Sequence, residues 1–203
     1  MVRDQAVRDS RLTCLAALAG VALLALPAAA AAEPFRLVLD PAATEVSFTL
    51  GARLHTVRGR FALAAGELRF DPDSGAASGE IRVDARSGDT GIGRRDRVMH
   101  EEVLDSARHP LLVLRPERIE VARREADALS GRLFGRFEVR GGSHPIALDF
   151  KGTRTGERAR VSARFDVPWV AWGLPDPSNA ILRVDDVLAV EVRAGGELGA
   201  APP

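Results

Sequence analysis

Apolar and polar residues alternate with a period of two along most of the chain from Phe35 onward. In residues 44–50, for example, Val46, Phe48 and Leu50 share one face, and the polar residues between them share the other. This alternation is typical of β-strands with one buried face and one face in water. The pattern recurs in segments 55–63, 67–70, 81–85, 131–139, 146–150, 161–167 and 187–192. The chain is therefore predicted to fold mainly as half-buried strands.

The connections between these segments are short. Turn-forming residues occur at Asp71–Gly75, Arg140–Ser143 and Gly195–Gly196. Residues 94–107 have a helix-forming composition without Gly or Pro, and Pro110 is expected to stop this helix. The sequence therefore predicts an all-β fold with one short helix between strands. Its antiparallel sheet is expected to close into a barrel or to fold into a sandwich.

The N-terminal residues differ in composition from the rest. Three arginines precede an apolar run from Leu12 to Leu26, and an Ala-rich stretch leads to Glu33. This is the pattern of a secretory signal peptide, with cleavage expected near Ala32. An uncleaved anchor is the alternative, but the run is shorter than the ~20 residues that a membrane-spanning helix needs. Cleavage would remove Cys14, the only cysteine.

These features predict three parts: a signal peptide at 1–32, a folded domain at 33–197 and a flexible tail at 198–203. The mature chain is expected to be exported and to have no transmembrane span. Lys and Arg number 28, and Asp and Glu also number 28, so the formal net charge is zero. This balance argues against nucleic-acid binding, because a surface that reads phosphates needs excess positive charge.

The sequence shows no motif for catalysis or for a cofactor. His100 and Glu101 begin like a zinc-protease helix, but Leu104 stands where the second histidine is needed. We therefore predict no catalytic residue, no metal ligand and no cofactor. A metal site built from distant strands, or a carboxylate pair brought together by the fold, stays open as an alternative.

Bulky apolar residues occupy the alternate positions of the predicted strands that are expected to point inward. They are Phe48, Phe61, Phe70, Phe137, Phe150, Phe165 and Trp169. A barrel of about eight strands either fills its interior with side chains or encloses one small ligand. Periodicity does not distinguish a packed core from a cavity.

Seven motifs in order, between Phe35 and Ala194, resemble the YceI-like family of bacterial periplasmic, lipocalin-like proteins. The motifs are Val46-Ser47-Phe48, the strands of Val57–Asp71, Thr90-Gly91 with Arg95-Asp96, Val103–Pro110, Leu129–Leu133, Val139–Pro145 and Val184–Val187. Two segments depart from the family pattern. Leu111–Leu114 lacks the usual Phe, and Phe165–Ser178 carries both tryptophans.

The resemblance implies an antiparallel, lipocalin-like barrel of about eight strands around an apolar tunnel. It further implies a periplasmic binding or carrier protein that holds an isoprenoid lipid, polyprenyl or quinone-like, and is not an enzyme. We expect Phe48, Phe61, Phe137, Phe150 and Phe165 to line the cavity wall, and Trp169 and Trp172 to line its mouth.

Polar and glycine residues complete the expected site. Arg95 and Asp96 are expected either to fix the start of the helix, with Arg95 pairing to a strand carboxylate, or to form a polar gate for a head group. Gly59 and Gly66 in strand context suggest bulges or close backbone approach.

Three other interpretations remain. The barrel could be an enzyme acting on a lipid or glycan, or a packed stress-related periplasmic protein without a ligand. An outer-membrane barrel fits poorly, because Tyr is absent, Trp occurs twice, and Arg58, Arg60 and Arg136 oppose the phenylalanines. A homodimer is compatible with the sequence.

Overall fold

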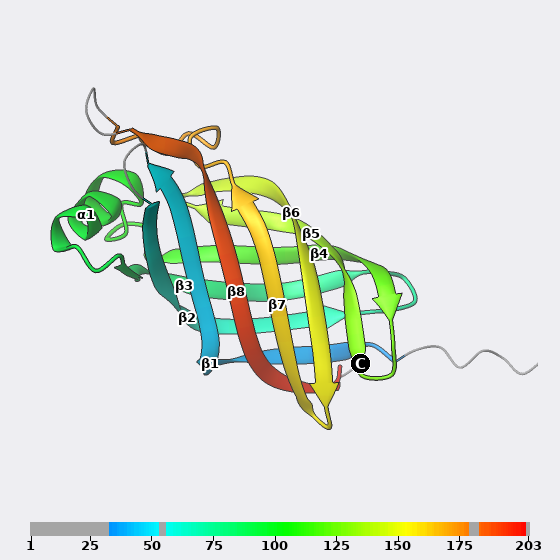
Figure 1. Ribbon diagram of the computed structural model, residues 1–203. Coiled ribbons are helices and arrows are strands. Elements are labelled where there is room, and N and C mark those ends of the chain that lie inside the picture. The colour runs from blue at the N-terminus through cyan, green and yellow to red at the C-terminus, as the bar shows by residue number, and fades with distance from the viewer. Residues whose placement is uncertain (1–32, 53–55, 179–182, 202–203) are drawn as a thin grey trace, which may run out of the picture. The chain divides into compact units, whose positions relative to one another are not determined.

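Eight antiparallel strands form a closed barrel in the computed structural model, which describes residues 33–52, 56–178 and 183–201 (Figure 1). The strands follow chain order, and β8 pairs with β1 to close the ring. They are β1 (Phe35–Ala52), β2 (Thr56–Phe70), β3 (Ala77–Asp89), β4 (Leu111–Arg124), β5 (Ala128–Val139), β6 (Gly142–Thr155), β7 (Arg158–Val167) and β8 (Val184–Ala200). The predicted barrel is confirmed, and closure excludes the sandwich. The predicted signal peptide lies outside the described residues.

Strand β1 is one long strand that contains a bulge. Its register against β2 shifts between Leu39 and Val46. Within the bulge, the Asp40 carboxylate accepts the Ala42 N–H at 2.9 Å, and the Thr44 hydroxyl donates to the Asp40 carbonyl at 2.8 Å. These local bonds replace the missing ladder bonds, so the chain bends without leaving the sheet.

The Gly195–Gly196 pair lies inside β8 and does not form the predicted turn. A Cβ at Gly196 would collide with the carbonyl oxygen of Val38 on β1, so the glycine permits the two backbones to approach. Beyond it, Leu198 pairs with Leu37 and Ala200 with Phe35. The expected tail at 198–203 therefore begins too early, because β8 continues to Ala200.

The predicted helix lies between β3 and β4 and is shorter than expected. It consists of α1 (Gly93–Val98) and one π-helical turn, η1 (Met99–Val103), rather than extending to Ala107. Arg140, in the tight β5–β6 turn, holds the end of η1 by donating to the Val103 carbonyl at 2.7 Å. Among the residues that the structure describes, no helix is long and apolar enough to cross a membrane.

The barrel has two distinct ends. At the helix end lie α1, η1, the β5–β6 turn and the segment 168–178, which follows β7. At the far end lie the turns 71–76, 125–127 and 156–157. Buried apolar side chains cover the inner face of the barrel, and Phe70 is the most buried large one at 2% exposure. The hydrophobic core is therefore the inner wall of the barrel.

Candidate binding cavity

A cavity of about 840 Å³ lies inside the barrel and is lined by residues of both ends. All eight described strands contribute side chains to its wall, and these are almost all Val, Leu, Ile and Phe. Every second side chain of a strand points into the barrel, and these side chains are apolar, so together they form the wall. The volume lies in the range of small-molecule sites and excludes the packed interior that the sequence left open.

All five phenylalanines predicted for the wall line this cavity. The rings of Phe48 and Phe61 lie 5.4 Å apart between centroids. Phe150 and Phe165 instead pack against the buried cluster that contains Phe70. Contact of any of these rings with a ligand stays a prediction.

Two glycines make room for large side chains of the wall, whereas the sequence suggested bulges or close backbone approach at these positions. Gly59 pairs with Phe48 across β1 and β2, and a Cβ there would collide with the ring of Phe48. Gly66 lies beneath Leu39, whose Cδ1 would be 2.8 Å from an added Cβ. Both positions need glycine because a large neighbour crosses over them.

The two tryptophans have different environments. Trp169 lines the cavity, is 6% exposed, and donates its indole N–H to the Asp185 carbonyl at 3.0 Å. Trp172 is not among the lining residues, so the prediction that it lines the mouth is wrong. It stacks on His144 with 4.6 Å between centroids and lies 5.8 Å from the wall residue Phe137. Trp172 therefore supports the wall rather than forming it.

An apolar cap covers the helix end of the cavity. Its residues are Val98, Met99, Val103 and Leu104 from the helical segment and Trp169 and Leu174 from the segment after β7. Leu104 and Leu174 are each 8% exposed. Sequence reasoning missed Leu174, because an isolated Leu in a Pro-rich segment has no periodicity. The helical residues could be found, because four apolar residues share one stretch of the predicted helix.

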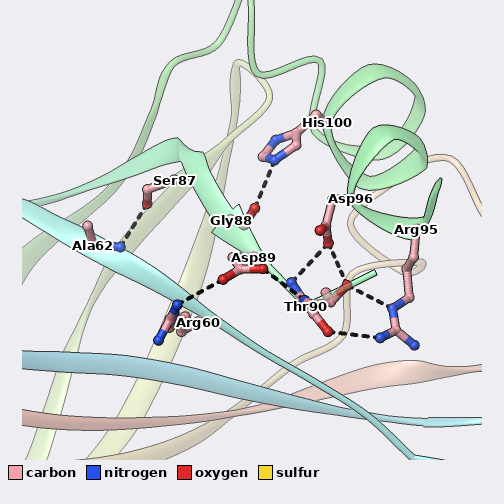
Figure 2. A network of polar contacts seen from close by, with 10 residues as sticks. Arg60, Ala62, Ser87, Gly88, Asp89, Thr90, Arg95, Asp96 and His100 are labelled. Atoms are coloured by element: carbon pink, nitrogen blue, oxygen red, sulfur yellow. Dashed lines mark hydrogen bonds and ion pairs between the residues drawn. The ribbon is translucent and has the colours of Figure 1, made fainter. Parts of the chain in front are cut away.

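Arg95 and Asp96 both bind Thr90, the residue after β3 (Figure 2). The Asp96 carboxylate accepts the Thr90 N–H at 2.9 Å and the Thr90 hydroxyl at 2.5 Å. Arg95 donates its Nε to the Thr90 hydroxyl oxygen at 2.8 Å and its Nη2 to the Thr90 carbonyl at 3.0 Å. Arg95 therefore binds Thr90 rather than the expected strand carboxylate. Asp96 also binds Thr90, rather than N–H groups at the start of the helix. Arg95 and Thr90 line the cavity, whereas Asp96 does not.

Further polar contacts hold the helical segment over β3 (Figure 2). The two ring nitrogens of His100 lie 2.9 Å from the Gly88 carbonyl and 3.1 Å from the Ser106 hydroxyl. Asp89 accepts a hydrogen bond from the Gly91 N–H at 2.8 Å and another from Arg60 at 2.9 Å. These two donors hold the pKa of Asp89 below its ordinary value.

Charged residues divide unequally between the two ends of the cavity. Among the described lining residues, Arg95 is the one charged group at the helix end. The far end is lined by Glu33, Glu125, Asp127, Glu157, Arg124 and Arg154. The described lining of the far end therefore contains four carboxylates and two guanidinium groups. Sequence reasoning missed this rim, because half of its residues belong to turns and no repeating pattern connects them.

Metal-binding geometry is absent from the described part of the chain. No three His, Cys, Asp or Glu side chains there lie close enough to hold a metal ion. The described lining of the cavity includes no histidine and no cysteine. The arrangement favours the binding of an apolar molecule with an oxygen-bearing group near Arg95.

Comparison with known proteins shows a family match and a shared fold. A family model described as the YceI-like domain matches residues 37–195. BcnA from Burkholderia cenocepacia is 16% identical over 77% of this chain and 98% of that chain, with a TM-score of 0.63. A polyisoprenoid binding domain from Saccharophagus degradans, implicated in plant cell wall breakdown, is 16% identical over 80% of this chain and 98% of that chain, also at 0.63.

A third solved structure is the YceI protein of Campylobacter jejuni. It is 15% identical over 71% of this chain and 86% of that chain, with a TM-score of 0.59. At such identities the three structures show that the fold is shared. A search of curated proteins gives no match to this chain.

Proposed function

We propose that this chain, which belongs to the YceI-like family, binds an isoprenoid lipid of the polyprenyl or quinone type inside its barrel. The observation that carries the proposal is the apolar cavity of about 840 Å³. Each buried CH₂ group contributes about 0.8 kcal/mol, so a long hydrocarbon tail gains much from such a wall. The Saccharophagus relative is described as a polyisoprenoid binding domain, which supports the same ligand class here.

Arg95 supports an orientation for the lipid. Two of its guanidinium nitrogens bind Thr90, and within the described residues Nη1 has no hydrogen-bond partner. Because Arg95 lines the cavity, this nitrogen is free to donate to a quinone carbonyl or another head-group oxygen. We therefore place the head group at the helix end and the tail along the barrel toward the far end.

The proposed role is that of a periplasmic carrier rather than an enzyme. Residues 1–32 have the sequence pattern of an export signal. Among the described residues, the lining at the helix end offers one guanidinium group and no carboxylate or imidazole. The proposed position of the head group is thus away from the four lining carboxylates of the far end, the groups that general acid–base catalysis would use.

Native mass spectrometry of the protein purified from its own periplasm tests the ligand class. We expect an added mass that organic extraction releases and that fragments as an isoprenoid. An empty protein that also fails to take up added ubiquinone or polyprenol would overturn the proposal.

A matched pair of variants tests the location of the ligand. Ala163 lines the cavity, whereas its neighbour Ser162 is exposed on the opposite face of β7. Ala163→Phe should fill the middle of the cavity and lower uptake of detergent-solubilised ubiquinone at least tenfold, while Ser162→Phe should leave uptake unchanged. Quenching of tryptophan fluorescence measures uptake, and circular dichroism checks folding. If Ala163→Phe does not fold, Ala159→Phe with Arg160→Phe as its control replaces it. Equal uptake by both members of a folded pair would contradict the proposed location.

A further inference from the structure

A short loop projects from the helix end of the barrel. Ile92 is 54% exposed, more than the other exposed large apolar residues that the structure describes. A Cβ added at Gly91 or at Gly93 would meet no atom within 4 Å, so the peptide on both sides of Ile92 stands clear of the barrel. Single exposed apolar residues are common on protein surfaces, so the surroundings of Ile92 decide its meaning.

Two exposed arginines lie two and five residues after Ile92. Arg94 and Arg97 have no ion pair or side-chain hydrogen bond within the described residues. By contrast, exposed arginines on the barrel wall, such as Arg132 and Arg164, pair with carboxylates of neighbouring strands. We call residues 91–97 the tip. The tip thus combines one exposed branched apolar side chain with two cations that the protein leaves uncompensated.

The tip adjoins the cavity through its own residues. Arg95, between the two exposed arginines, lines the cavity together with Thr90. Residues 94–97 contain three arginines and one carboxylate, Asp96, which binds Thr90, and Glu101 and Glu102 follow in η1. At the far end, the cavity is lined by four carboxylates and two arginines. Within the described cavity lining, the helix end thus has one positive charge and the far end an excess of carboxylates, which favours the helix end for contact with an anionic surface.

We infer that the tip docks on the surface of a membrane that contains anionic lipids. In this arrangement Ile92 enters the interfacial region, and Arg94 and Arg97 bind lipid phosphates. One apolar side chain and two cations give weak, reversible attachment, which suits a protein that leaves the membrane with its cargo. The inference rests on the proposed function for the cargo alone, since the attachment uses no residue of the cavity wall.

Vesicle binding tests this docking directly. The probe is vesicles of two parts phosphatidylcholine to one part phosphatidylglycerol, without any isoprenoid, compared with pure phosphatidylcholine vesicles. We expect co-sedimentation with the anionic vesicles that weakens as salt is added. Arg94→Gln with Arg97→Gln should lower the partition coefficient about 30-fold, as expected for two cations near a membrane surface. Ile92→Ser should lower it about tenfold through lost apolar burial.

Matched control variants lie elsewhere on the exterior. Arg158→Gln with Arg160→Gln removes two exposed arginines of β7 at the far end, and Val187→Ser removes a 44% exposed apolar side chain on β8. Both controls should bind vesicles like the wild type. Loss of binding in the controls equal to that in the tip variants, or no binding of wild type to anionic vesicles, would overturn the inference.

A second readout separates this inference from the proposed function. The tip variants should take up detergent-solubilised ubiquinone normally, because Ile92, Arg94 and Arg97 do not line the cavity. Their uptake of ubiquinone from anionic vesicles should be slowed. Wild type that binds vesicles but takes up no ubiquinone would refute the proposed function and leave the docking intact.

Discussion

Glu67 is the carboxylate whose ionisation is most strongly tied to the folded barrel. Arg36 donates to it at 2.6 Å and Arg69 at 3.1 Å. The hydrogen bond from Arg36 is the main reason that the pKa of Glu67 is lowered to about 2. A carboxylate with a lowered pKa stabilises the fold fully above its unfolded pKa, and this stabilisation is lost as the pH falls through the folded pKa.

We therefore expect the melting temperature of Glu67→Gln to depend less on pH in the acid range than that of the wild type. The melting temperature of the wild type should fall between pH 4.5, the ordinary pKa of the side chain, and pH 2. That of Glu67→Gln should fall less over the same interval. Thermal unfolding followed by circular dichroism measures both. Glu45→Gln is the control, because Glu45 lies 3.9 Å from Arg193 and both are exposed. Parallel profiles of wild type and Glu67→Gln would contradict this prediction.

Gly59 makes a prediction about packing. An added Cβ would press on the ring of Phe48, so Gly59→Ala should destabilise the protein by about 1–3 kcal/mol. Phe48→Leu removes the obstructing ring atoms, so the added cost of Gly59→Ala should be smaller in that background. Urea denaturation of the two single variants and the double variant measures this coupling. Additive free energies would show that Phe48 is not the obstacle.

At this scale the sequence predicts wall positions but not polar partners. Parity alone placed Phe48 and Phe165 on the inner face, because the side-chain period of a strand is fixed. The binding of Arg95 and Asp96 to Thr90 was not foreseen. It depends on the path of residues 91–93, which no periodicity describes.

At the scale of the elements, the indole of Trp169 ties the segment 168–178 to β8. Trp169→Phe keeps a ring in the cap but removes the donor to the Asp185 carbonyl. We expect a loss of about 0.5–1.5 kcal/mol in the free energy of unfolding, because the part-buried hydrogen bond from the indole N–H is lost. Trp172→Phe is the matched control and should cost less, since an aromatic ring still stacks on His144. A larger loss for Trp172→Phe in urea denaturation would reverse the roles given to the two tryptophans.

Element boundaries show where sequence patterns mislead. Asp40–Thr44, which interrupts the alternation of β1, and Gly195–Gly196, which the sequence predicts as a turn, both lie inside strands. In the first, side chains bond locally within a bulge. In the second, glycine is needed because Val38 of the neighbouring strand approaches closely. Local composition indicates which conformations the backbone can adopt, whereas strand pairing decides whether such a segment forms a turn or stays inside a strand.

For the whole molecule, the seam between β3 and β4 has the shortest ladder of paired residues in the ring. These strands pair only over Ile81–Asp84 and Leu111–Leu114, because the helical segment is inserted beside them. Arg115 adds ion pairs to Glu80 at 2.5 Å and to Glu138 at 2.8 Å. Strands β1 and β8, by contrast, pair over most of their length.

We expect the barrel to open first at this seam. Backbone amides of 81–84 and 111–114 should exchange hydrogen faster than those of β1 and β8, because fewer cooperative bonds hold them. Arg115→Gln should accelerate exchange at the seam and leave the β1–β8 pair unchanged. Native-state hydrogen exchange followed by mass spectrometry measures both. Equal protection of the two strand pairs would refute this expectation.

The overall architecture could be predicted from the sequence, whereas the presence of the cavity could not be derived from periodicity. Inward parity gives the same pattern of Val, Leu and Phe for a filled barrel and for a hollow one. The difference lies in the summed side-chain volume relative to the size of the ring, which the strand pairing sets. The expectation of a tunnel came from the family resemblance.

Within the described residues, the inner wall of the barrel is both the hydrophobic core and the proposed binding surface, so folding and binding depend on the same side chains. A cargo that binds only the folded chain adds stability in proportion to the logarithm of its concentration. Proteases act mainly on chains that have opened. Empty copies would therefore be degraded sooner than loaded ones, and the steady-state level of the protein would follow the supply of its lipid.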